Sequence, residues 1–100
     1  MILQDYCRSK GKRTNMEEYL RTYCEIDLKA IRENYINIKK KTGDKAMTMA
    51  VIKADGYGHG AVEVAHYLSD IADYFGVATI DEGVELRKAG LKQPILLLGY

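Results

Sequence analysis

From residue 27 onward the sequence switches repeatedly between two hydrophobic periods, and this alternation limits the possible folds more than any other feature. Apolar residues at three- and four-residue steps predict three helices, between Asp27 and Gly43, from Ala61 to Leu68, and between Thr79 and Gly90. Short apolar runs predict three strands, at 46–52, 74–78 and 95–98. The order αβαβαβ is typical of right-handed crossovers and a parallel sheet.

Residues with known capping preferences mark the ends of the predicted helices. Asp27 can cap the first helix, Lys39 to Lys41 suit the negative end of its dipole, and Gly43 can end it. The apolar positions of this helix are Leu28, Ile31, Tyr35 and Ile38. Thr79 and Glu82 have the spacing of a capping box, which predicts the start of the third helix.

The first predicted strand, Ala46 to Ile52, is an almost continuous apolar run that only Thr48 interrupts. A strand of this kind is expected to be covered on both faces. Two α/β architectures fit the order of elements, an open doubly wound sheet and the beginning of a (β/α) barrel, and the pattern alone does not choose between them. Both place ligands at the carboxyl ends of the strands, so we expect chemistry at residues 53–60.

Charge and cysteine content exclude several classes of partner. The formal net charge is +1, with 15 basic and 14 acidic side chains, so there is no electrostatic basis for binding nucleic acid or acidic membranes. Cys7 and Cys24 lack the spacing of a disulfide framework or a zinc site, and no metal site is predicted. No apolar run approaches the ~20 residues of a membrane helix. A cytoplasmic location is therefore expected.

Residues 1–22 are predicted to form a flexible leader, and residues 23–100 the structured domain. The leader is basic but lacks the apolar centre of a signal peptide. Met16, which precedes the structured pattern, is a candidate for the true start of translation.

Residues 53–60 allow a dinucleotide-binding interpretation. Gly56, Gly58 and Ala61 satisfy the pattern G-x-G-x-x-A, and Asp81 follows at a distance suited to a ribose. The signal is weak, because short glycine patterns recur by chance and three residues separate the strand from the first glycine. Asp81 and Glu82 are also explained as helix-start residues that the dipole favours.

A second interpretation makes Lys53 a Schiff-base lysine. The strand before it would fix its position, and apolar neighbours would partly desolvate it so that a neutral amine is accessible near physiological pH. Tyr57 could donate a hydrogen bond to a phosphate, and a helix N-terminus near Ala61 could support the anion. The structural alternatives are a solvated Lys53, a packing Tyr57 and a His59 that bonds only within its loop.

The same segment resembles the cofactor-lysine signature of the alanine racemase family, A-V-x-K-A-x-x-Y-G-H-G. Here it reads Ala50-Val51-Ile52-Lys53-Ala54-Asp55-Gly56-Tyr57-Gly58-His59-Gly60. The resemblance covers about residues 22–99 in order and includes Glu25-Ile26-Asp27-Leu28, Asp81-Glu82, Leu86-Arg87 and Pro94-Ile95-Leu96-Leu97-Leu98-Gly99. A match of this length favours the lysine interpretation over the dinucleotide one.

The resemblance implies the N-terminal part of a (β/α)8 barrel, joined in the family to a second, mainly β domain, with pyridoxal 5′-phosphate bound on Lys53. It implies that Tyr57 contacts the phosphate and that Val51 and Leu98 lie against the cofactor. It also implies that Lys53 exchanges the α-proton of alanine on one face, while a tyrosine from the partner subunit of a homodimer acts on the other. The implied activity is alanine racemisation, which supplies D-alanine for peptidoglycan.

The number of predicted strands is small for this fold. A complete (β/α)8 barrel takes about 250 residues, whereas this sequence of 100 residues supplies three candidate strands. We therefore expect an incomplete barrel that is inactive alone and has an unpaired apolar strand at 95–98. Two alternatives remain open, a non-catalytic cofactor-binding or partner-binding fragment and a racemase for another amino acid such as serine.

Overall fold

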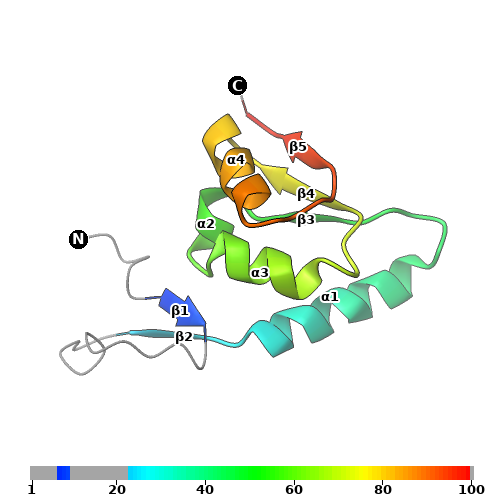
Figure 1. Cartoon of the computed structure of the whole chain (residues 1–100). Coiled ribbons are helices and arrows are strands. Elements are labelled where there is room, and N and C mark those ends of the chain that lie inside the picture. The colour runs from blue at the N-terminus through cyan, green and yellow to red at the C-terminus, as the bar shows by residue number, and fades with distance from the viewer. Residues whose placement is uncertain (1–6, 10–22, 100) are drawn as a thin grey trace.

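The structure is a computed structural model that describes residues 7–9 and 23–99. Its elements are β1 (Cys7–Ser9), β2 (Cys24–Ile26), α1 (Leu28–Thr42), β3 (Met49–Val51), α2 (Lys53–Tyr57), α3 (Ala61–Leu68), β4 (Tyr74–Val77), α4 (Ile80–Lys88) and β5 (Ile95–Leu97). Strands β3, β4 and β5 form one parallel sheet in that order, with Ala50 opposite Phe75 and Phe75 opposite Ile95 (Figure 1). The predicted α/β class and parallel sheet are confirmed.

Three elements were not predicted from the hydrophobic pattern, the short α2 and the strands β1 and β2. The two strands pair in parallel, with Cys7 opposite Cys24 and Ser9 opposite Ile26. Of the predicted leader at 1–22, only residues 7–9 fall within the part of the chain that the structure describes. The candidate start at Met16 lies outside it.

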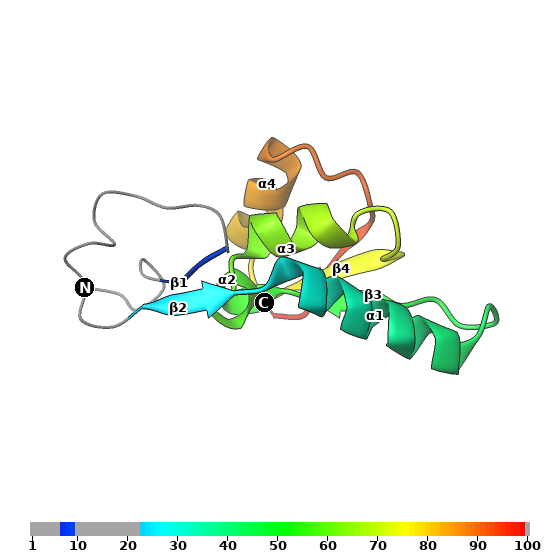
Figure 2. The ribbon, with the colours of Figure 1, turned by 90° about the horizontal axis from the view of Figure 1, so that it is seen from below.

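The core lies between one face of the three-stranded sheet and helices α3 and α4. Phe75 and Ala65 are completely buried, and Val77 and Leu86 are 1% exposed. These residues come from β4, α3 and α4, and they belong to one contiguous apolar cluster. Helix α1 packs against α3 on the side away from the sheet, and Figure 2 shows the two helices side by side from below.

The opposite face of the sheet carries no helix in the described residues. Met49, Leu96 and Leu98 are 38%, 49% and 46% exposed. The prediction that β3 is covered on both faces is therefore wrong for these residues, because both crossover helices pack on one side. The apolar side chains on the other face therefore remain partly exposed among the described residues.

Helix ends follow the capping predictions. The Asp27 carboxylate accepts a hydrogen bond from Ala30 N at 3.0 Å, and Gly43, at φ +72°, ends α1. Thr79 and Glu82 make both bonds of the capping box at the start of α4. Ile38, however, is 57% exposed, because the partly buried side of α1 passes from Tyr35 to Lys39 one turn later.

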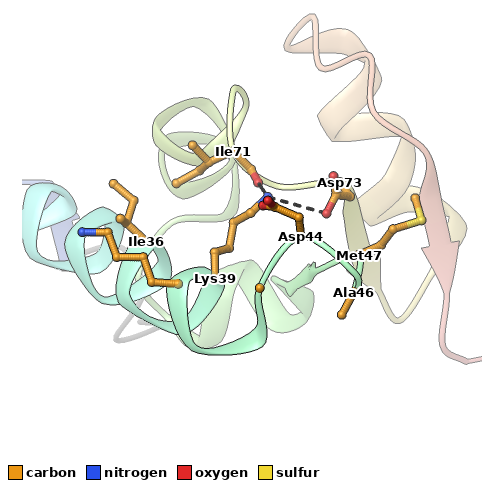
Figure 3. A pocket seen from close by; sticks show the side chains of 9 residues that line it. Ile36, Lys39, Asp44, Ala46, Met47, Ile71 and Asp73 are labelled. Carbon is orange, nitrogen blue, oxygen red and sulfur yellow. Dashed lines mark hydrogen bonds and ion pairs between the residues drawn. The ribbon is translucent and has the colours of Figure 1, made fainter.

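Polar contacts tie α1 to the rest of the domain at the amino ends of the strands. Lys39 Nζ donates to Ile71 O at 2.6 Å and lies 3.7 Å from Asp73 Oδ2 (Figure 3). Hydrogen bonding from Thr48 N, followed by the charge of Lys39, outweighs burial and lowers the pKa of Asp73. Lys39, Ile71 and Asp73 are among the residues that line a cavity of about 390 Å³. The cavity is at the opposite end of β3 from Lys53, so it is separate from the predicted site.

A second contact, between Arg32 and Asp70, gives a pH-dependent prediction. The two guanidinium nitrogens of Arg32 lie 2.6 and 2.8 Å from the Asp70 carboxylate oxygens, and these hydrogen bonds lower the pKa of Asp70 from 3.8 to about 2. Because the folded-state pKa is the lower one, the contribution to stability is present above pH 3.8 and is lost as the pH falls toward about 2. The stability difference between the wild type and Asp70→Asn should shrink over that range in chemical unfolding. An unchanged difference at pH 2 would contradict the assignment.

Candidate active site

The carboxyl ends of the three parallel strands carry several of the residues that the sequence singled out. Val51 ends β3 and is followed after one residue by Lys53, and Leu98 directly follows β5. Gly76 of β4 lies between them. A Cβ placed on Gly76 would be 3.2 Å from Leu98 Cδ1 and 3.4 Å from Val51 Cγ2. The structure therefore places Val51 and Leu98 together on the helix-free face of the sheet, across a position that has no side chain.

The segment after Lys53 is a left-handed turn. Ala54, Asp55, Gly56 and Tyr57 have φ values of 51°, 54°, 63° and 57°. A non-glycine residue in this conformation is disfavoured by about 1–2 kcal/mol, and the turn contains three of them. Backbone strain of this kind persists only where surrounding contacts impose it, and it concentrates at functional sites. The sequence predicted only a glycine-rich loop here.

Asp55 supplies one of the contacts that hold the turn. Its Oδ1 accepts a hydrogen bond from Ala61 N at 2.9 Å, and its carbonyl accepts one from Gly60 N at 2.9 Å. The first N–H group of α3 is thus already bonded to a carboxylate. Ala61 N is therefore not free for a phosphate, whereas the prediction that the helix N-terminus near Ala61 supports an anion stays a prediction for the N–H groups that follow it.

Replacing Asp55 by alanine should lower the free energy of unfolding by about 1 kcal/mol, within the range of about 0.5–2 known for lost helix caps. Asp55→Asn is the matched control, because asparagine retains a side-chain acceptor and tolerates a positive φ. Chemical unfolding of both variants tests this. Equal stability of the alanine and asparagine variants would show that the bond to Ala61 does not matter.

The backbone geometry also argues against a dinucleotide-binding turn. The N–H groups of Gly58, Gly60 and Ala61 all donate within the segment, to Ala54 O, Asp55 O and Asp55 Oδ1. None of these three donors remains for a pyrophosphate. Asp81 is an exposed residue in the first turn of α4, as its interpretation as a helix-start residue predicted.

The aromatic residues of the segment differ in their surroundings. Tyr57 is 59% exposed, and its hydroxyl has no partner among the described residues. It is therefore available to a ligand and does not serve packing. His59 Nδ1 lies 3.0 Å from Gly56 O, which agrees with a histidine that bonds within its loop.

Glu82 connects this segment to the neighbouring strand. Its Oε1 accepts from Ala54 N at 3.0 Å, and its Oε2 accepts from Ala78 N at 2.6 Å and from Thr79 N at 3.2 Å. Burial alone would raise the pKa of Glu82, but the three N–H donors, together with the charge of Lys53, outweigh it and lower the pKa below its usual value. The capping role was predicted, whereas the bond to Ala54 has no sequence signal because it joins residues 28 positions apart.

These groups fit pyridoxal phosphate. Lys53 offers a half-buried amine at the end of a strand, and Tyr57 offers an unoccupied phenol. Val51, Met49 and Leu98 form an apolar surface that closes over Gly76, and such a surface suits contact with an aromatic ring. Within the described part of the chain, no group of histidine, cysteine and acidic side chains could hold a metal ion. None of the helices in these ranges has the length and apolar character to span a membrane.

Comparison with known sequences identifies relatives of this chain. The family model for the N-terminal domain of alanine racemase matches residues 26–100. A catabolic alanine racemase of Pseudomonas aeruginosa is 59% identical over 73 residues, which are 73% of this chain and 20% of that protein. Alanine racemase 1 of Bacillus subtilis is 51% identical over 82 residues, 81% of this chain and 21% of that protein. The chain thus spans about one fifth of the length of these relatives.

Solved structures give the same result. An alanine racemase from Clostridium difficile matches with a TM-score of 0.72 and 50% identity, over 75% of this chain and 20% of that one. An alanine racemase from Bacillus anthracis with bound L-Ala-P matches with a TM-score of 0.71 and 41% identity, over the same shares of the two chains. This likeness decides between the two predicted architectures in favour of a partial (β/α) barrel. The chain belongs to the alanine racemase family.

Proposed function

We propose that the protein containing this chain interconverts L-alanine and D-alanine, with pyridoxal 5′-phosphate bound covalently to Lys53. The observation that carries the proposal is the position of Lys53, which directly follows β3 at the carboxyl edge of a parallel sheet whose helix-free face is apolar and partly exposed. The relatives at 59% and 51% identity are named alanine racemases. Their names suggest the substrate, and the motif around Lys53 together with its place at the end of β3 supports the choice of residues.

The residues of this chain have distinct proposed roles. The Lys53 amine holds the cofactor and, when substrate replaces it, moves the α-proton on one face of the substrate. Tyr57 donates its phenolic O–H to the cofactor phosphate, and Val51 and Leu98 contact the ring. Pyridoxal phosphate, when bound, stabilises negative charge at the α-carbon of the amino acid.

Racemisation needs proton exchange on both faces of the α-carbon. One base alone would tend to return the proton to the face that it left, and Lys53 serves one face only. We therefore propose a second base, a tyrosine from the partner subunit of a homodimer, as the family resemblance implies. Residues 23–100 would form the first part of the barrel, with Met49 and Leu98 facing its interior. The proposed location is the cytoplasm, where the product would supply D-alanine for peptidoglycan.

The test uses the protein expressed from its whole gene. After incubation with pyridoxal phosphate and reduction with borohydride, the peptide that contains Lys53 should carry the cofactor mass, and D-alanine should form from L-alanine. Absence of cofactor from that peptide would overturn the proposal. An adduct on Lys53 without any racemisation would favour a non-catalytic cofactor-binding role, and racemisation of serine in preference to alanine would correct the substrate.

A further inference from the structure

We propose that Glu82 is a positioning residue for Lys53, because its carboxylate joins the peptide N–H that follows Lys53 to the two N–H groups that follow β4. This inference rests on the proposed function, since it assigns a role toward the cofactor lysine. Its physical basis is the hydrogen-bonded bridge itself.

The bridge connects segments that the sheet alone leaves unconnected. The ladder between β3 and β4 ends at the pairing of Val51 with Gly76, with one further bond from Ile52 N to Gly76 O at 2.8 Å. Beyond that point the chain leaves the sheet and enters the left-handed turn. Glu82 Oε1 at 3.0 Å from Ala54 N extends the connection to the residue directly after Lys53.

The bridge also opposes the strain of the turn. Ala54 is the first residue with a positive φ, at 51°, and a non-glycine residue adopts this conformation only when contacts impose it. Two contacts anchor the ends of the turn, the Glu82 bond at Ala54 and the Asp55 bond to Ala61. Since the Lys53 side chain leaves the backbone at the entry to this turn, relaxation at Ala54 would reorient it.

A carboxylate suits three N–H donors in this geometry. Its two oxygens offer about four acceptor sites, whereas a glutamine amide has one oxygen and would place an NH₂ group against one set of donors. Aspartate keeps the charge, but its side chain is one methylene shorter. Replacement by glutamine should therefore break one side of the bridge while preserving the size of the side chain.

If Glu82 served only to cap the start of α4, other changes at that helix start should have the same effect. Two variants test this alternative. Asp81→Asn removes a neighbouring negative charge from the same helical turn, at an exposed residue. Thr79→Ala removes the hydroxyl that accepts from Glu82 N at 3.2 Å and leaves the Glu82 carboxylate in place. Neither change touches the bond to Ala54.

The experiment compares Glu82→Gln, Asp81→Asn and Thr79→Ala in the protein expressed from its whole gene. Loss of a hydrogen bond to a charged acceptor corresponds to about a 10- to 100-fold change in an equilibrium constant. In the cofactor-free protein, exchange of the Ala54 amide should accelerate by about that factor in Glu82→Gln only. The dissociation constant for pyridoxal phosphate should rise, and the visible circular dichroism of the bound cofactor should change, again in Glu82→Gln only.

The outcomes separate this inference from the proposed function. If the wild type attaches the cofactor to Lys53 but Glu82→Gln behaves like Asp81→Asn, the inference is wrong and the function stands. If the wild type attaches no cofactor, the proposed function is wrong, and with it the positioning role. If Thr79→Ala and Glu82→Gln changed amide exchange and cofactor affinity equally, Glu82 would act only as a helix cap and the inference would be wrong. If the Glu82→Gln protein does not accumulate in cells, Glu82→Asp is tested instead. The same changes in amide exchange, cofactor affinity and circular dichroism are expected.

Discussion

Replacing Lys53 by alanine is expected to abolish covalent attachment of pyridoxal phosphate and to lower alanine racemisation by about 10⁴-fold or more. The expected loss is large because the proposed mechanism uses the same amine twice, first to hold the cofactor and then to move a proton. Racemisation is measured by coupled oxidation of the D-alanine formed, and attachment by the mass of the peptide that contains residue 53.

Two controls show whether the loss is due to the missing amine, to the missing charge or to removal of any lysine. Lys53→Arg keeps a positive charge but presents a guanidinium, which stays protonated and does not act as a nucleophile. It should lose cofactor attachment as completely as Lys53→Ala. Lys45→Ala removes an exposed lysine before β3, at the opposite end of that strand, and should leave both measurements unchanged. Substantial racemisation by Lys53→Ala would refute the assignment of this residue.

Much of the fold was readable because its elements depend on local chemistry. The cap at Asp27, the end at Gly43 and the box formed by Thr79 and Glu82 each involve residues within four positions of the helix end. The predicted strands were correct in place but slightly long, since β3 spans Met49–Val51 rather than residues 46–52. A strand ends where its hydrogen bonds to a neighbouring strand end, and those bonds depend on tertiary structure. The apolar run in the sequence can extend beyond that point.

The uncovered face of the sheet illustrates what a hydrophobic pattern cannot specify. Leu96 and Leu98 are apolar and nearly half exposed, while Phe75 on the other face is completely buried. The pattern places apolar side chains on both faces, but it does not say which residues, if any, cover each face. In the described ranges, helices cover only one face.

The sequence indicated candidate residues for the site but not the backbone conformation of the segment that carries them. The motif around Lys53 was recognisable from side chains, but the left-handed turn that follows it was not. Glycine is the residue that signals positive φ, and here Ala54 and Tyr57 adopt it against their own preference. Such a conformation results from contacts with distant residues, of which the Glu82 bond to Ala54 is the clearest example.

Replacing Phe75 by alanine is expected to lower the free energy of unfolding by about 3–5 kcal/mol, the range found for aromatic side chains removed from a core. Phe75 is completely buried in the central strand of the sheet, where it lies opposite Ala50 on one side and Ile95 on the other. Its removal leaves a cavity between the sheet and its helices. Chemical unfolding measures the loss.

Ile80→Ala is the matched control for this prediction, because Ile80 is 66% exposed and its truncation should change stability by less than about 0.5 kcal/mol. Phe75→Ala and Lys53→Ala should then have opposite effects on stability and on cofactor attachment. At low temperature the folded fraction of Phe75→Ala should still attach the cofactor, because Phe75 faces the helices and Lys53 does not depend on its contacts. Lys53→Ala should keep its stability and lose attachment. If Phe75→Ala remained fully stable but lost the cofactor, Phe75 would be a residue of the site and not of the core.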